Sequence, residues 1–142
     1  MKERLSNMEL KRPIQLIKEA RFVFICGNGG SSATAEHLSN DLFSKGIKAI
    51  CLSSNSSIMT MIGNDFGYEL TFSRQLEVYG TSEDLLIAIS CSGTSPNVVN
   101  ALDTALKIGM PTIQFETFDK DRDYEGLEDR HMQTVHEIKK LL

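Results

Sequence analysis

Four hydroxyl side chains stand close together in the run Ser90-Cys91-Ser92-Gly93-Thr94-Ser95. A helical pattern follows from Pro96, and Ser95 is predicted to be its N-cap. Free backbone N–H groups and the helix dipole at such a position favour an anion, and hydroxyls can satisfy phosphate oxygens without a fixed positive charge. The sequence therefore predicts a phosphate-binding turn, with a solvated Ser-rich loop as the simpler alternative.

A second glycine-rich turn, Gly27-Asn28-Gly29-Gly30-Ser31, follows another short apolar run. A dinucleotide-binding fingerprint would require glycine at Ser32 and an acidic residue after the second strand, where the sequence reads SSNSS. A Walker loop would require a lysine, and the turn has none. No nucleotide cofactor is expected, and the turn is predicted to offer backbone amides and small polar side chains to a ligand.

Two pairs of polar residues have helical spacing. His37 and Asp41 lie four positions apart and so share one helix face, where Asp41 could act as a base or the pair could ligate a divalent metal. Gln133 and His136 form a second pair, three positions apart. Taken alone, each pair is more often a solvated helix face than a functional site.

Short apolar segments alternate with helical patterns and must position these turns. Strands are predicted at 22–26, 48–52, 85–89 and 111–115, and helices at 2–20, 31–44, 57–62, 69–79, 96–108 and 129–142. Residues 63–67 are expected to separate two short helices, and 118–129 to be irregular. The alternation predicts an α/β three-layer sandwich with a parallel sheet of four to five strands. Both turns then lie at the carboxyl ends of strands, where such sheets bind ligands.

The whole chain restricts the class of protein further. Its 142 residues fit a single domain, and a net charge of −4 with scattered Lys and Arg argues against a nucleic-acid partner. No apolar run approaches the ~20 residues that span a bilayer, and the N-terminus has no secretion signal. Cys26, Cys51 and Cys91 are isolated and indicate reduced thiols, so a cytoplasmic protein without a membrane partner is expected.

The domain 1–142 is predicted to have three parts. Residues 1–20 form an oligomerisation helix, 21–117 form the ligand-binding core, and 129–142 form a C-terminal helix. Because both terminal helices carry an apolar stripe, we expect neighbouring subunits to bury them.

Three segments together resemble the sugar isomerase (SIS) domain and, within it, the phosphoheptose isomerase family. They are CGNGGSSATAEHLSNDL (26–42), IGNDFGYELTFSRQLEVYG (62–80) and AISCSGTSPNVVNALDTALKIGM (88–110), in order and at family-like spacing. The resemblance implies the flavodoxin-like SIS fold, a phosphorylated sugar as ligand and a homotetramer or dimer. It also implies conversion of sedoheptulose 7-phosphate into an aldose heptose 7-phosphate through an enediol.

The resemblance further implies roles for individual residues. The phosphate-binding turn comprises Ser90, Cys91, Ser92 and Ser95, with Cys91 where threonine is usual. Other substrate contacts are implied at Asn28, Gly29, Gly30, Ser31, Asn64, Asp65 and Gln133. Zinc is the implied cofactor, with His37, Asp41 and Gln133 as its ligands. Asp41 also stands where the family has a glutamate base, and His136 is the second candidate catalytic residue.

Three departures from the family pattern leave other functions open. The position of the family's catalytic histidine is Leu141, and the family's last strand is missing between 117 and 129. Asp41 is one methylene shorter than glutamate, and such a displacement can cost about 100-fold in rate. A non-catalytic sugar-phosphate module that acts as a sensor or a scaffold, of the type that binds the replication initiator, is the main alternative. A truncated copy that folds only by oligomerising is a third.

Overall fold

Four parallel strands form one sheet in the computed structural model, which describes residues 9–118 and 121–142. The strands are β1 (Val23–Cys26), β2 (Ala49–Cys51), β3 (Leu85–Ala88) and β4 (Thr112–Gln114), in the spatial order β2-β1-β3-β4. β1 pairs with β3 along its whole length, from Val23 with Leu85 to Cys26 with Ala88. All residues of these two central strands are buried, as their continuous apolar runs predict.

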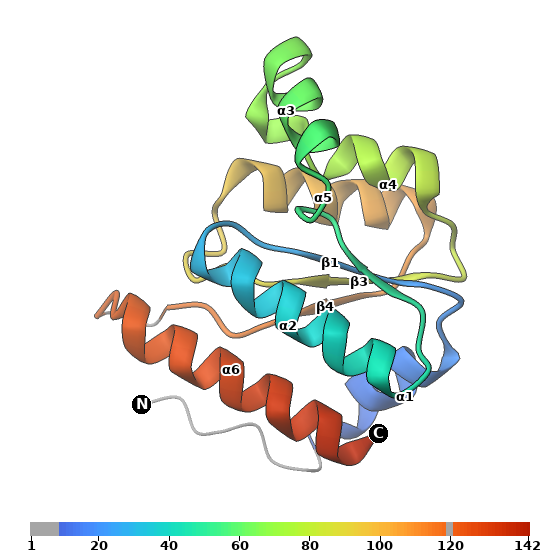
Figure 1. The fold of residues 1–142 in the computed structure, drawn as a ribbon, viewed down its shortest axis with the longest axis vertical. Helices are drawn as coiled ribbons and strands as arrows, with labels where there is room; N and C mark the ends of the chain where they lie inside the picture. Colours follow the sequence, from blue (N-terminus) through green and yellow to red (C-terminus); the bar gives the residue numbers. More distant parts are fainter. Residues whose placement is uncertain (1–8, 119–120) are drawn as a thin grey trace.

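Helices cover both faces of the sheet (Figure 1). α1 (Lys11–Glu19), α2 (Gly30–Ser44) and α6 (Tyr124–Leu141) lie on one face, and α4 (Ser73–Tyr79) and α5 (Pro96–Ile108) lie on the other. Between β2 and α4 the chain forms α3 (Ser56–Asp65) and a short 3₁₀ helix, η1 (Tyr68–Leu70). These two helices contact each other. The predicted three-layer α/β sandwich is confirmed.

Alternating side chains of β1 supply the two halves of the core. Val23 and Ile25 pack with Leu38 and Leu42 of α2 on one face. Phe24 points to the other face and belongs to a separate cluster with residues of α4 and α5. Because successive side chains of a strand point in opposite directions, one short apolar run can bury both faces. The fold is thus two apolar layers divided by the sheet.

The prediction that residues 63–67 separate two helices was wrong for residues 63–65, which are helical. α3 continues through Gly63, Asn64 and Asp65, and the chain leaves the helix only at Phe66. The start of α3 is stabilised because the Asn55 side chain accepts a hydrogen bond from the backbone N–H of Ile58. A single glycine lowers helix stability by only about 1 kcal/mol relative to alanine, so Gly63 does not end it.

The last helix begins at Tyr124, five residues before the predicted start at 129. Asp123 is its N-cap and accepts the backbone N–H of Gly126 at 3.0 Å. Leu127, near the start of this helix, is fully buried. The acidic composition of the segment gave no sign of this buried position. Residues 124–129 of the segment predicted to be irregular are therefore helical.

The apolar stripes of the two terminal helices are covered by the chain's own core. Ile14 and Ile17 of α1, and Val135 and Ile138 of α6, belong to the same buried cluster as the central strands. α1 begins at Lys11, and residues 1–8 of the longer predicted helix lie outside the described residues. The stripes therefore no longer argue for an oligomer, which stays a prediction that needs another basis.

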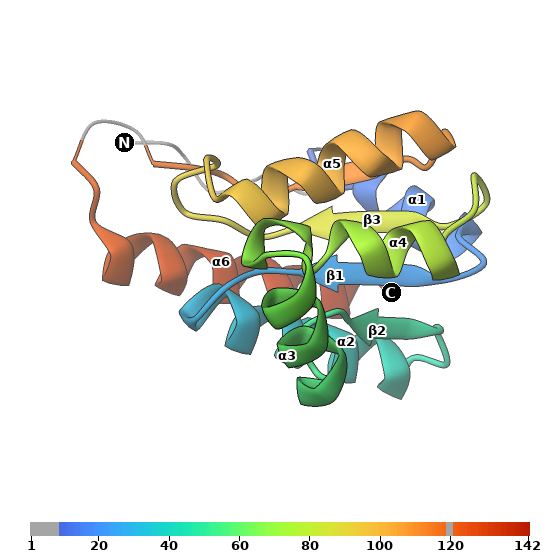
Figure 2. The same ribbon diagram turned by 90° about the horizontal axis from the view of Figure 1, so that it is seen from above.

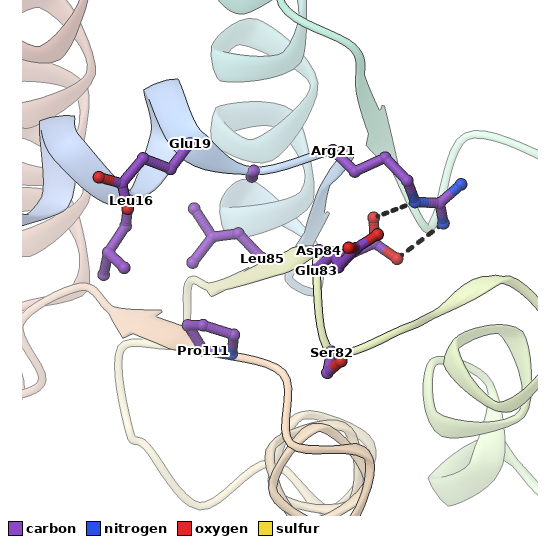
Figure 3. A pocket seen from close by; sticks show the side chains of 9 residues that line it. Leu16, Glu19, Arg21, Ser82, Glu83, Asp84, Leu85 and Pro111 are labelled. Carbon is purple, nitrogen blue, oxygen red and sulfur yellow. Dashed lines mark hydrogen bonds and ion pairs between the residues drawn. The ribbon is translucent and has the colours of Figure 1, made fainter.

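A buried carboxylate joins the amino-terminal ends of β1 and β3. Asp84 is 1% exposed and accepts two hydrogen bonds from Arg21, at 3.0 and 2.9 Å (Figure 3). The backbone N–H and the hydroxyl of Thr81 also donate to it, at 2.7 and 2.9 Å. Burial opposes ionisation, but these hydrogen bonds outweigh it and hold the pKa of Asp84 below its usual value. The pair is thus ionised in the folded chain.

Replacing Asp84 with asparagine should lower the free energy of unfolding by about 2 kcal/mol at pH 7, because the Arg21 fork loses its charged acceptor. A depressed folded-state pKa gives stability that is present above the unfolded pKa and is lost as the pH falls through the folded pKa. The gap between wild type and Asp84→Asn in urea denaturation should therefore shrink below about pH 4. Glu83→Gln, at an exposed neighbour, should leave stability unchanged at pH 7. Equal stability of Asp84→Asn and wild type at pH 7 would contradict this account.

Candidate functional site

The two polar turns meet in one cleft at the carboxyl ends of β1 and β3. Figure 2 shows both turns leaving the sheet at the same end, where α6 also begins. The cleft encloses about 160 Å³, and its lining residues are Asn28, Ser31, Ile89, Ser90, Cys91, Ser92, Ser95, Tyr124 and Glu128. The structure thus brings together the predicted phosphate turn and the predicted substrate turn.

Hydrogen bonds within the 90–95 turn shape it around the cleft. The Ser90 hydroxyl accepts the N–H of Gly93, and the Ser92 hydroxyl accepts the N–H of Thr94, both at 3.1 Å. Gly93 has φ +69°, and a Cβ there would lie 2.9 Å from Thr117 Cγ2. Only glycine suits this position, because both the backbone angle and the adjacent side chain exclude a Cβ.

Ser95 occupies the predicted N-cap position of α5, but its side chain makes no capping hydrogen bond. The backbone carbonyl of Ser95 instead accepts the N–H groups of Val98 and Val99, at 3.0 Å each. Pro96 follows at the first helical position, where its missing N–H costs nothing. The Ser95 hydroxyl faces the cleft without a capping role, so it can donate to a ligand.

The Asn28 side chain is held by partners that the sequence analysis did not identify. Asn28 and Asn97 exchange two amide hydrogen bonds of 2.8 and 2.9 Å, and the Tyr68 hydroxyl donates to Asn28 at 2.9 Å. Asn97 is 1% exposed and also donates to the Thr71 hydroxyl at 3.2 Å. This network fixes the 27–31 turn against α5. In the sequence, the one sign of this network is a polar residue, Asn97, on the first turn of a buried helix.

Glu128 is the second lining residue that the sequence did not reveal. It lies on α6, and a Cβ added at Gly30 would lie 2.7 Å from its carboxyl carbon. Gly30 is the first residue of α2, so the carboxylate stands at the start of that helix. A helix N-terminus favours an anion, and the Glu128 carboxylate lies beside this one. Gly30 therefore leaves room for an internal carboxylate at the mouth of the cleft.

The cleft attracts anions through dipoles and not through cationic side chains. No Lys or Arg is among the described residues that line it, whereas α2 and α5 both begin beside it. Burial raises the pKa of the Cys91 thiol, and a hydrogen bond with Ser31 only partly opposes this. The thiol is therefore neutral near pH 7 and adds no negative charge. Hydroxyls, amides and helix starts remain to bind a dianion.

A second group of polar side chains lies further along α2, where it packs against α6. Asp41 Oδ2 is 3.4 Å from His37 Nε2, and the His37 and His136 rings are 5.6 Å apart. Asp41 Oδ1 is 3.2 Å from Lys139 Nζ, a partner that the sequence analysis did not consider. Ser31 and Asp41 are ten residues apart on α2, about 15 Å along the helix axis. Asp41 is thus separated from the cleft within one chain.

The remaining predicted site residues belong neither to the cleft nor to the group around Asp41. Asn64 donates to Asp65 at 2.9 Å at the exposed end of α3, and neither residue lines the cleft. Gln133 is exposed on α6 and also does not line it. Leu141 packs against the apolar core, so the position of the family's catalytic histidine faces the interior.

The residues of the second group do not fit a zinc ion within one chain. Among residues 9–118 and 121–142, no group of three or more His, Cys, Asp or Glu side chains is arranged to hold a metal. A structural or catalytic zinc site needs three or four such donors around one point. Lys139 Nζ, moreover, takes the position beside Asp41 Oδ1. Zinc binding stays a prediction without support from this geometry.

A larger hollow of about 450 Å³ lies at the opposite edge of the sheet (Figure 3). Its lining includes Arg21, Asp84 and Pro111, at the amino-terminal ends of β1, β3 and β4. Ligands of such sheets bind at the carboxyl ends, so this hollow is not the candidate site. None of the helices in the described part of the chain has the length and apolar character needed to cross a bilayer.

Comparison with known proteins agrees with the fold and the two turns. The family model described as "SIS domain" matches residues 13–116, which contain both of them. The chain belongs to the SIS domain family. The predicted resemblance to this family is therefore confirmed.

Curated relatives of this SIS domain are named phosphoheptose isomerases. The relative from Helicobacter pylori (strain P12) is 41% identical over 125 residues, which are 80% of this chain and 65% of the relative. The relative from Trichlorobacter lovleyi is 44% identical over 109 residues, which are 72% of this chain and 56% of the relative. The chain thus spans 65% or less of the length of these relatives.

A solved phosphoheptose isomerase from Neisseria gonorrhoeae superimposes on the SIS domain with a TM-score of 0.83 and 26% identity. The superposition covers 92% of this chain and 83% of the solved one. The described chain therefore has the same fold as the superposed part of that enzyme.

Replacing Glu128 with glutamine should tighten binding of a phosphate monoester about fivefold. Two negative charges about 4 Å apart and well exposed to water repel by about 1 kcal/mol, and glutamine removes one of them. Isothermal titration with a sugar phosphate measures the change. Glu125→Gln, in the exposed first turn of the same helix, is the matched control and should leave the affinity unchanged. Weaker binding by Glu128→Gln would show that the carboxylate contacts the ligand favourably.

Proposed function

We propose that the chain is a ketose–aldose isomerase for a phosphorylated sugar, of the phosphoheptose isomerase type. The observation that carries the proposal is the cleft of hydroxyls and helix starts, formed by two turns inside residues 13–116, the region that the SIS domain model matches. Ser90, Ser92 and Ser95 donate to the phosphate, and the missing Cβ of Gly93 lets the turn approach it closely. Sedoheptulose 7-phosphate is the proposed substrate.

The proposed chemistry moves one proton between adjacent carbons. Asp41 removes a proton from C1 of the ketose while O2 takes up a proton, which gives an enediol. O1 then loses its proton while Asp41 returns the first proton to C2, which gives the aldose. The Asp41 carboxylate suits this role because it lies 3.4 Å from His37 Nε2 and is mostly shielded from water. His136, beside His37, is the proposed second group at this end of the site.

We propose that the complete site lies between subunits. The cleft and Asp41 are separated by about 15 Å along α2, which exceeds the length of an extended seven-carbon sugar phosphate. One chain would therefore hold the phosphate while Asp41 of another chain reaches C1 and C2. Exposed apolar residues such as Phe43, Val78 and Leu106 give neighbouring chains a surface to bury. A homotetramer or dimer is proposed on this basis.

Purified protein should convert sedoheptulose 7-phosphate, measured in a coupled assay for the aldose product. Asp41→Asn should lower the rate by about 100-fold to 10,000-fold, because general base catalysis contributes factors of this size. Asp103→Asn, at an exposed aspartate on α5, is the matched control and should keep wild-type activity. Thermal stabilisation by the sugar phosphate without turnover would instead support the non-catalytic sensor or scaffold.

Mixing two inactive variants tests the shared site. Asp41→Asn lacks the base, and a Ser90→Ala/Ser92→Ala variant lacks phosphate donors, so each alone should be nearly inactive. When the two are unfolded, mixed and refolded together, some sites should combine an intact cleft with an intact Asp41, and activity should partly return. Refolding each variant alone is the control. No recovery in mixed oligomers would show that one chain carries the whole site.

The proposed location is the cytoplasm. Cys26, Cys51 and Cys91 are all buried free thiols in the structure. Reduced cysteines are typical of cytosolic proteins, and a sugar-phosphate substrate is consistent with that compartment.

A further inference from the structure

Asp41 is a nearly buried carboxylate at the contact between α2 and α6. The residue is 7% exposed, and its Oδ2 atom is buried without a hydrogen-bond partner. Its Oδ1 atom lies 3.2 Å from the Nζ of Lys139, whose side chain is half exposed. A carboxylate removed from water needs a nearby positive charge or strong hydrogen bonds, since desolvation of an ion is costly.

Lys139 is the neighbour that can supply this charge. His37 is the other group facing the carboxylate, at 3.4 Å, and it is a cation only when protonated. Lys139 reaches across from α6, where its stem can cover apolar surface while its ammonium group stays at the edge of the buried contact. The aliphatic stem and the terminal charge therefore suit a carboxylate that is buried on one side only.

We propose that Lys139 is the resident counterion of Asp41 and occupies the position that a divalent metal would need. An ammonium group at 3.2 Å repels a metal ion brought to the same carboxylate. The ligand set is also short, because no group of three or more His, Cys, Asp or Glu side chains among residues 9–118 and 121–142 could hold a metal ion. Lys139 is thus a positioning residue that holds the Asp41 carboxylate without a metal.

The inference does not depend on the proposed isomerase activity. Its two readouts are thermal stability and metal affinity of the full chain, and neither requires turnover. An inactive protein that passes both tests would contradict the proposed function alone.

Thermal denaturation tests the pairing. Lys139→Met should lower the Tm by about 2–4 °C, because the buried carboxylate loses its counterion. Lys140→Met, at the exposed neighbouring lysine, is the matched control and should leave the Tm unchanged. In an Asp41→Asn background the effect of Lys139→Met should disappear. Equal Tm values for Lys139→Met and Lys140→Met would overturn the proposal.

Metal titration tests the second half of the proposal. Wild type and Lys140→Met should bind Zn²⁺ weakly in calorimetry, whereas Lys139→Met should bind it at least about tenfold more tightly, since a positive charge has left the carboxylate. The gain should be lost in Lys139→Met/Asp41→Asn. Lys139→Arg keeps the charge and should behave as wild type. If Lys139→Met does not fold, Lys139→Gln is compared with Lys139→Arg. Tight Zn²⁺ binding by wild type that requires Asp41, or unchanged affinity in Lys139→Met, would overturn the proposal.

Discussion

The parallel pairing of β1 with β3 is the constraint on which the candidate site depends. Four residue pairs, from Val23 with Leu85 to Cys26 with Ala88, fix the two strands in register. Because the strands run in the same direction and end together, the turns at 27–31 and 90–95 must emerge side by side. Burial of both strands on two faces makes a shift of register costly, since it would move every side chain to the wrong layer. The cleft is therefore a direct consequence of the sheet.

Helix dipoles and one carboxylate, more than ion pairs, define the electrostatics of the cleft. Two helices begin there and no basic side chain of the described residues lines it, so its attraction for anions comes from oriented N–H groups and hydroxyls. The Glu128 carboxylate lies beside one of these helix starts. Under the proposed function, a phosphate in the cleft would have to coexist with this carboxylate or displace it, so α6 would take part in ligand selection although its sequence has no phosphate motif.

The contact between α2 and α6 links the cleft to the second polar group. Glu128 meets the first turn of α2, and His136 and Lys139 meet its third and fourth turns. The early start of α6, fixed by Asp123 and the buried Leu127, sets this alignment. A helix beginning at 129 would lack the turn that carries Glu128. α6 thus contributes residues to both ends of the proposed site.

The sequence by itself determined the strands, the two turns, the layer order and the SIS family, because these features depend on local patterns of burial and on glycine and serine at defined positions. Only the tertiary structure decided that Asn97 holds Asn28, that Glu128 enters the cleft and that Lys139 pairs with Asp41. Each of these contacts joins residues more than 60 positions apart. Such contacts depend on how helices pack across the sheet, which no local pattern in α6 or α5 specifies.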